Sequence, residues 1–249
     1  MENDTLQALI FDVDGTLADT ESAHCAAFNQ AFAEVGKVWV WDEALYTRLL
    51  EISGGKERIL HYWREVAPEL RDIGDGVRDT VARIHELKTA AYERAVQEGA
   101  VALRPGVLRL IESAHQAGMQ LAIATTTSPV NIAALLRKAI GSDWSHYFIV
   151  IEDASTAPHK KPHPQVYLQT LKRLRLPASA CLAFEDSSNG LRAATGAGLA
   201  TIVTPNSFTA HHDFSGALRV LPDLSEVTLG HLHDWHAESI ARAKPAIAH

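Results

Sequence analysis

Two aspartates, Asp12 and Asp14, follow an apolar run near the start of the chain and are followed directly by Gly15 and Thr16. The run at residues 6–12, LQALIFD, predicts a short buried strand. Buried carboxylates must be paired or bind a cation, and the C-terminal end of a strand is where open α/β sheets hold their ligands. The pair is therefore a candidate catalytic or metal-binding site rather than a turn that closes a strand.

Polar side chains also end three later apolar segments. These residues are Thr125, Thr126 and Thr127 after the segment 120–125, Lys161 in the loop after 147–151, and Glu185 and Asp186 at the end of 181–186. Carboxylate oxygens suit Mg²⁺, while lysine and hydroxyl donors complement phosphate oxygens. A carboxylate that faces a metal-bound phosphoryl group can attack it and form an aspartyl-phosphate. The pattern predicts phosphoryl transfer with Mg²⁺ as cofactor.

The arrangement of predicted elements explains how these residues can meet. Helices at 106–116, 129–139, 164–174 and 189–195 alternate with strands at 120–125, 147–151, 181–186 and 200–204. Such alternation predicts βαβ units and a doubly wound parallel sheet, in which polar strand ends share one crevice. Helical segments at 21–35, 42–66 (with a break at Ser53-Gly54-Gly55) and 75–97 separate the first strand from the rest. We therefore predict an α/β core at residues 1–18 and 99–230, a helical domain inserted at 19–98, and a C-terminal tail at 231–249.

Composition excludes several classes of protein. The chain has 249 residues, 47% of them hydrophobic, and a formal net charge of -7 with both signs mixed, which does not suit a nucleic-acid-binding surface. Its two cysteines, Cys25 and Cys181, are far apart, and no segment predicts a membrane span or a signal peptide. We expect a cytoplasmic monomer that binds neither nucleic acid nor membrane.

The ordered set DVDGT, Thr125, Lys161-Pro162 and Glu185-Asp186 resembles the haloacid dehalogenase (HAD) superfamily of phosphohydrolases. The resemblance implies that Asp12 is the nucleophile and that Asp14 protonates the leaving oxygen and then activates water. It also implies phosphate contacts from Thr125, Thr126 and Lys161. The implied Mg²⁺ ligands are Asp12, Asp14, Glu185 and Asp186. Because position 14 is an aspartate, the chain resembles the phosphatases and phosphomutases of the superfamily rather than its dehalogenases.

The helical insert resembles the cap of the β-phosphoglucomutase-like subfamily. Segments 53–59, 102–107, 124–128 and 160–164 are similar to its xylulose-1,5-bisphosphate phosphatases, which remove an inhibitor of Rubisco and release xylulose 5-phosphate. This similarity implies that a glycine-containing segment, SGGKER, binds the phosphate that is not cleaved. The substrate-binding residues it implies are Glu21, His24, Tyr46, Ser53, Gly54, Gly55, Lys56, Arg58, Lys88 and Thr127.

Other interpretations remain open at this point. The core motifs also suit a phosphomutase of the β-phosphoglucomutase type, a phosphatase of another phosphosugar, or a catalytically inactive phosphosugar sensor. SGGKER alone is also compatible with a simple helix break, and Glu21, His24 and Tyr46 with ordinary packing or surface positions. We expect surface positions for the histidines of the tail and core positions for three tryptophans of the insert. These residues are His231, His233 and His236, and Trp39, Trp41 and Trp63.

Overall fold

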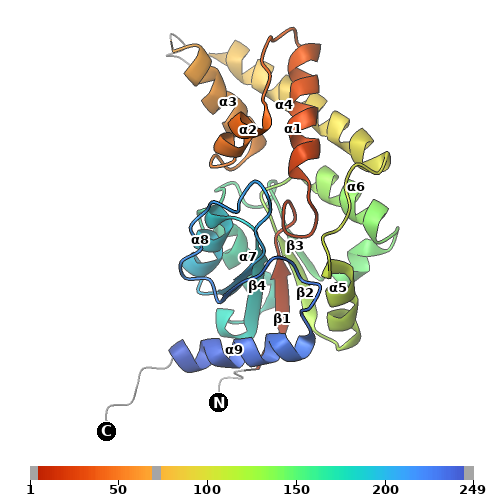
Figure 1. Cartoon of the computed structure of the whole chain (residues 1–249), viewed down its shortest axis with the longest axis vertical. Coiled ribbons are helices and arrows are strands. Elements are labelled where there is room, and N and C mark those ends of the chain that lie inside the picture. Colours follow the sequence, from red (N-terminus) through yellow and green to blue (C-terminus); the bar gives the residue numbers. More distant parts are fainter. Residues whose placement is uncertain (1–4, 69–73, 244–249) are drawn as a thin grey trace.

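A parallel sheet lies at the centre of the computed structural model, which describes residues 5–68 and 74–243 (Figure 1). Within these ranges its six strands have the order β3-β2-β1-β4-β5-β6, and every pair is parallel. The strands are β1 (Ala8–Phe11), β2 (Gln120–Ala124), β3 (Val150–Glu152), β4 (Cys181–Glu185), β5 (Ala200–Val203) and β6 (Arg219–Val220). Phe11 pairs with Ile123 and with Phe184, so β1, β2 and β4 end at one level. The residues that follow these strands therefore open at the same edge.

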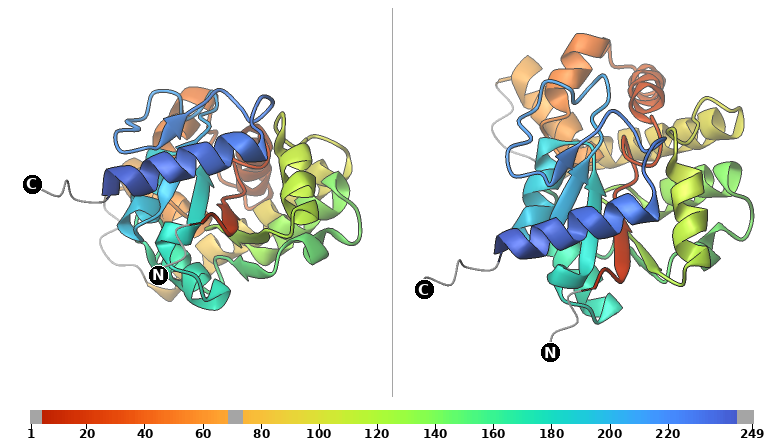
Figure 2. Two further views of the ribbon diagram at one scale, coloured as in Figure 1. Left: turned by 90° about the horizontal axis from the view of Figure 1, so that it is seen from below. Right: turned by 60° about the horizontal axis from the view of Figure 1, so that its bottom comes forward.

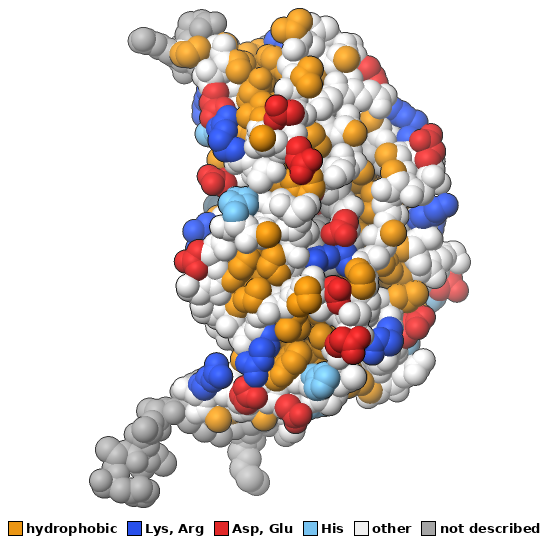
Figure 3. Space-filling model, in the orientation of Figure 1, with side chains coloured by type: hydrophobic (Ala, Val, Ile, Leu, Met, Phe, Trp, Pro, Cys, Tyr) orange, Lys and Arg blue, Asp and Glu red, His pale blue; other side chains and the backbone are white. Residues whose placement is uncertain are grey.

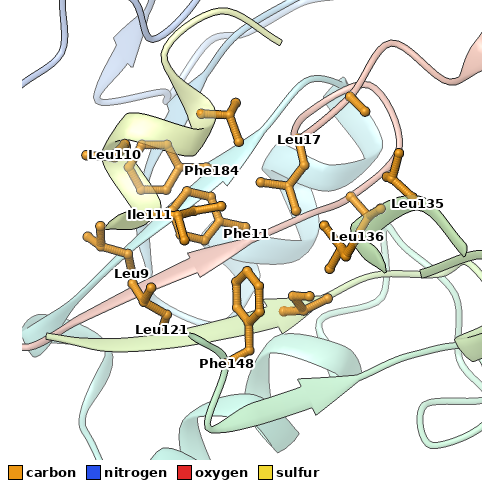
Figure 4. Close-up of a cluster of buried hydrophobic side chains, with 14 of the residues drawn as sticks. Leu9, Phe11, Leu17, Leu110, Ile111, Leu121, Leu135, Leu136, Phe148 and Phe184 are labelled. Carbon is orange, nitrogen blue, oxygen red and sulfur yellow. The ribbon is translucent and has the colours of Figure 1, made fainter. Parts of the chain in front are cut away.

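Helices cover both faces of the sheet, as a doubly wound fold requires. Along β1, Leu9 and Phe11 point to one face and Ala8 and Ile10 to the other, because side chains alternate along a strand. The first face packs against α5 (Val107–Gln116), α6 (Pro129–Ala139) and α9 (Leu229–Ala243), and Phe11 stacks on Phe184 within that cluster (Figure 4). The second face packs against α7 (Gln165–Leu174) and α8 (Ser188–Gly196). The predicted fold class is confirmed.

Among the described residues between β1 and α5, four helices cover the C-terminal edge of the sheet (Figure 1). They are α1 (Glu21–Glu34), α2 (Glu43–Leu49), α3 (Gly55–Val66) and α4 (Asp75–Gln97). These helices have an aromatic cluster of their own, in which Trp41 is fully buried while Trp39 and Trp63 pack at its edge. The chain leaves and re-enters the sheet layer at adjoining points, where Ala18 and Leu103 form an antiparallel bridge.

The C-terminal segment differs most from the expectation. Residues 231–249 carried no predicted element, but α9 runs across the molecule near the N-terminal ends of the strands and buries Leu232 (Figure 2). His236 is buried, with a ring nitrogen 2.8 Å from the carbonyl oxygen of Ser179, so its expected surface position is wrong. His231 and His233 are exposed, as expected.

Two further differences concern strands. β3 starts at Val150 rather than at residue 147, because Trp144–Tyr147 form a 3₁₀ turn before it. A second 3₁₀ turn, Ala178–Ala180, precedes β4. The two-residue strand β6 had no counterpart in the sequence analysis.

The surface is mixed in charge on the face shown in Figure 3, where acidic and basic side chains are interspersed. In the ranges that the structure describes, every helix is too short or too polar to cross a bilayer. Both cysteines are free; Cys25 is half-buried and Cys181 is buried.

Candidate active site

A cavity of about 380 Å³ lies between the C-terminal edge of the sheet and helices α1–α4. The loops after β1, β2 and β4, the loop before α7 and the start of α3 all line it. Except for Tyr46, every site residue predicted from the sequence contributes to the lining. These residues are Asp12, Asp14, Glu21, His24, Ser53, Gly54, Gly55, Lys56, Arg58, Lys88, Thr125, Thr126, Thr127, Lys161, Glu185 and Asp186.

Three buried carboxylates gather at the floor of the cavity. Asp12, Glu185 and Asp186 each offer an oxygen, and these oxygens lie within 4.8 Å of one another. The ammonium group of Lys161 lies 2.6 Å from Asp12 Oδ1 and 2.6 Å from Glu185 Oε1, and Tyr167 donates its hydroxyl to Glu185. When all are ionised, three negative charges face one positive charge.

The pKa values of this cluster show how poorly its charge is balanced. Burial raises the pKa of Asp12 and of Asp186, and it raises the pKa of Glu185 to about 7, although Lys161 opposes the change at each carboxyl. Burial alone would lower the pKa of Lys161, but Asp12 and Glu185 outweigh it and raise that pKa. A divalent cation would neutralise the remaining charge, and a set of oxygen ligands fits Mg²⁺. The residues therefore fit the predicted metal.

Asp14 occupies a separate position, although it was predicted as a metal ligand. Its carboxylate lies 3.1 Å from His24 Nε2, outside the cluster of Asp12, Glu185 and Asp186. The His24 ring stacks on Tyr92 with a centroid separation of 3.9 Å, which fixes its orientation. Burial alone would raise the pKa of Asp14, but His24 and Lys88 outweigh it and hold this pKa below its ordinary value. Asp14 is therefore ionised in this arrangement.

Hydrogen-bond donors and helix starts border the acidic cluster. The Thr127 amide donates to Thr125 Oγ1 at 3.3 Å, and Thr126 also lines the cavity. Ser128 caps α6 and Ser187 caps α8, and both residues line the cavity. The N-terminal ends of two helices thus meet the carboxylates, and helix N-termini favour anions such as phosphate.

The helical side of the cavity carries the SGGKER segment at the start of α3. Gly54 has φ +96°, a conformation that favours glycine, and Gly55 begins the helix. The Lys56 side chain is exposed and lines the cavity. Ser53 Oγ lies 3.3 Å from Asn189 Nδ2, which also donates to the Glu51 carbonyl at 2.9 Å and so joins the segment before α3 to the first turn of α8.

Arg58 and Tyr46 support the cavity wall through a hydrogen-bond network. Arg58 donates to the carbonyls of Leu49 and Ile52 at 3.0 and 3.2 Å, and to the Tyr46 hydroxyl at 3.2 Å. The Tyr46 hydroxyl donates in turn to Glu21 Oε2 at 2.9 Å. Tyr46 therefore does not line the cavity itself but holds Glu21, which does. The guanidinium of Arg58 already donates hydrogen bonds to protein atoms.

Several residues around the site were missed by the sequence analysis. Tyr167 contacts Glu185, and Asn206 Nδ2 donates to Asp186 Oδ2 at 2.8 Å. The buried guanidinium of Arg104 donates to the carbonyls of Gly15 and Thr204 and so fixes the turn that follows Asp14. Arg104 had a usable signal, because a charged residue directly precedes Pro-Gly where the chain returns to the core; Tyr167 and Asn206 had none.

Comparisons with known proteins identify relatives that cover most of this chain. A family model described as haloacid dehalogenase-like hydrolase matches residues 6–198. The chain is 57% identical to the plasmid-encoded CbbY protein of Cupriavidus necator over 221 residues, which cover 89% of this chain and 87% of that protein. It is 30% identical to a phosphorylated carbohydrates phosphatase of Thermotoga maritima over 200 residues, covering 79% of this chain and 84% of that protein.

Solved structures give the same result. CbbY from Rhodobacter sphaeroides has been solved in complex with phosphate and, as a point mutant, in complex with xylulose-(1,5)bisphosphate. Both structures match with a TM-score of 0.82 and 44% sequence identity, over 89% of this chain and 96% of theirs. More distant matches, which include a β-phosphoglucomutase, share the fold.

Proposed function

Since this chain belongs to the haloacid dehalogenase-like hydrolase family and is a sugar-phosphate phosphatase, we propose that it converts xylulose-1,5-bisphosphate to xylulose 5-phosphate and inorganic phosphate. One observation carries the proposal. A single cavity is lined both by the Asp12, Lys161 and Asp186 group and by the Gly54-Gly55-Lys56 turn. The first suits a phosphoryl group that reacts, and the second suits a phosphate that is only held. The complex of the related CbbY with this bisphosphate supports the choice of sugar.

Asp12 is the proposed nucleophile. A carboxylate oxygen of Asp12 attacks phosphorus, the bond from phosphorus to the sugar oxygen breaks, and that oxygen takes a proton from Asp14. Water then attacks the phosphorus of the aspartyl-phosphate while Asp14 takes its proton, and Asp12 is released with inorganic phosphate. Each proton that leaves Asp14 in the first step is replaced in the second.

The ionised state of Asp14 suits the second step directly. For the first step Asp14 must hold a proton, although His24 and Lys88 lower its pKa. A phosphate dianion beside Asp14 raises the pKa of the carboxyl, because a nearby negative charge disfavours ionisation. We infer that Asp14 gains its proton when the substrate enters.

Mg²⁺ is the proposed cofactor, with Asp12, Asp186 and Glu185 as the residues that would hold or surround it. When bound it would neutralise charge on the reacting phosphoryl group. Thr125, Thr126 and Lys161 would donate to the phosphoryl oxygens. Asn206 holds one oxygen of Asp186, which orients this carboxylate without a metal.

Helices α1–α4 form the proposed cap, within residues 19–98. The Gly55 and Lys56 amides and the Lys56 ammonium would hold the second phosphate, with Ser53 beside them. Glu21, His24, Lys88 and Thr127 would contact the sugar or the bridging oxygens from the remaining walls of the cavity. Binding energy from a remote group can orient the reacting group. These contacts with the second phosphate would therefore raise kcat as well as lower KM.

The test is phosphate release with Mg²⁺ across a panel of pentose and hexose mono- and bisphosphates, with Asp12→Asn as the control. We expect the highest kcat/KM for xylulose-1,5-bisphosphate and a loss on the order of 10⁴-fold in kcat for the variant. Isomerisation of a sugar monophosphate without net phosphate release would identify a phosphomutase instead. Preference for another phosphosugar would overturn the substrate, and turnover by the variant within tenfold of wild type would overturn the nucleophile.

A further inference from the structure

His85, on α4, lies against the start of α3 inside the cavity. A Cβ atom placed on Gly55 would lie 2.9 Å from His85 Cδ2 and 3.0 Å from Nε2, so the ring packs directly on the glycine. The side chain is half-buried, and within the described ranges no hydrogen bond engages either ring nitrogen. The imidazole thus presents an unused polar edge beside the turn proposed to hold the second phosphate.

The charged and titratable groups that face His85 come from four different parts of the chain. They are Lys56 on α3, Lys88 on α4, His24 on α1 and Lys160 in the loop before α7, with Glu57 beside Lys160. Burial, followed by the charges of Lys88, Lys56, His24 and Lys160, lowers the pKa of His85 to about 4. The ring is therefore uncharged near pH 7 and carries one N–H donor and one acceptor.

An uncharged donor suits this position. The lysines already supply positive charge for an anion, and one more cation would increase their mutual repulsion when the cavity is empty. A neutral imidazole can instead fix the orientation of the bound phosphate, since its N–H donates in one direction within the ring plane. The missing side chain at position 55 leaves the space that the ring needs.

We propose that His85 is a specificity-determining residue that donates, as uncharged imidazole, an N–H to the substrate phosphate that is not cleaved. The inference rests on the proposed function, because it requires a substrate with two phosphates. It adds to the SGGKER segment a contact from a different helix, so that α3 and α4 both hold the same anion.

The experiment compares wild type with His85→Ala and His85→Gln, and uses Lys56→Ala as a reference for the second phosphate site. For each protein, kcat/KM is measured for xylulose-1,5-bisphosphate and for p-nitrophenyl phosphate, which has a single phosphate. A hydrogen bond to a charged group corresponds to a loss of about tenfold or more. We expect that loss for His85→Ala with the bisphosphate alone, and recovery to within about fivefold of wild type in His85→Gln, whose amide keeps a donor.

The pH dependence separates the uncharged donor from a charged one. The pH dependence of kcat/KM reports the protonation of the free enzyme, in which the ring is uncharged throughout pH 6 to 8.5, so the ratio of wild type to His85→Ala should stay constant over this range. A ratio that shrinks as pH rises would indicate an imidazolium donor and would overturn the proposal. Failure of the glutamine to restore the bisphosphate reaction, or an equal loss with p-nitrophenyl phosphate, would do the same.

A second variant covers the case in which His85→Ala alters the fold. Gly55→Ala places a methyl group against the ring and should displace it, with the same selective loss; in the His85→Ala background it should add nothing. Additive effects would overturn the proposal. If Lys56→Ala is selective and His85→Ala is not, the inference alone is wrong. If wild type does not prefer the bisphosphate and neither variant is selective, the proposed function fails and the inference with it.

Discussion

The acidic cluster of Asp12, Glu185 and Asp186 has one positively charged partner within 4.0 Å in the described ranges, Lys161. The variant Lys161→Met should therefore lower the free energy of unfolding. The Lys161 ammonium lies 2.6 Å from two carboxylates and its side chain is 5% exposed. Removing one partner of a buried ion pair costs about 3–5 kcal/mol, because the other charge stays buried without compensation. Without Mg²⁺ at pH 7.5, we expect a loss of this size in the free energy of unfolding, a large part of the total for an ordinary domain.

The direction of the pH effect follows from Glu185. Burial raises its pKa from 4.5 to about 7, so the stability associated with its protonated form is full below about 4.5 and is lost as pH rises through about 7. Without Lys161 the carboxyls lose their main opposing charge, and their pKa values rise further. A proton can then replace the missing ammonium at lower pH, so the deficit of the variant relative to wild type should shrink between pH 7.5 and pH 5.5.

The assay is urea unfolding followed by far-UV circular dichroism, at both pH values, with EDTA and with Mg²⁺. Lys172→Met is the matched control, since Lys172 is an exposed lysine on α7 whose removal changes net charge equally. Mg²⁺ should restore part of the loss in Lys161→Met by opposing the three carboxylates. A deficit under about 1 kcal/mol at pH 7.5, or an equal deficit at both pH values, would refute the reasoning.

Three further predictions concern catalysis. Asp14→Asn should lower kcat by about 10²–10⁴-fold, and less for a substrate with a good leaving group; equal losses for good and poor leaving groups, with aspartyl-phosphate formation rate-limiting, would contradict a proton-transfer role. Mg²⁺ should support activity, EDTA should abolish it and Ca²⁺ should inhibit, because Ca²⁺ adopts looser geometry with more ligands; full activity after exhaustive chelation would exclude the metal. Burial lowers the pKa of Lys88 to about 8, so kcat/KM for the bisphosphate should fall as pH rises through about 8 and the ammonium is lost. Lys88→Arg keeps its charge and should remove this fall, and a profile unchanged from wild type would show that another group titrates.

The sequence was most informative where local signals and sheet geometry agree. Helix α6 has the predicted bounds, 129–139, because Ser128 and Pro129 are strong start signals. The residues after β1, β2 and β4 could be predicted to meet because parallel strands end at one edge, and the register of Phe11 with Ile123 and Phe184 produces that arrangement.

What could not be predicted depends on contacts between distant parts of the chain. Tyr167 has the position of a core residue on an amphipathic helix, and its hydroxyl partner lies on β4, 18 residues away. Asp12 pairs with Lys161 and Asp14, two positions later, pairs with His24, so the two carboxylates have different partners that come from distant parts of the chain. α9 was missed because exposed histidines and acids interrupt its apolar spacing, and its burial against the sheet is a tertiary contact.

The bridge between Ala18 and Leu103 has a consequence for how such an enzyme can diversify. Since the ends of the inserted segment adjoin, with the Arg104 amide 2.9 Å from the Leu17 carbonyl, the insert closes a loop without spreading the strands apart. The sheet would keep its strand order if the 84 intervening residues, 19–102, were replaced by a short linker or by helices of another shape. The proposed nucleophile, Asp12, lies before this junction, and Lys161, Glu185 and Asp186 lie after it, so these residues stay together in the core whatever the insert contains. Exchange of the segment between these two adjoining ends would therefore change the residues that face the substrate from the helical side and would keep the carboxylates and the lysine of the sheet edge.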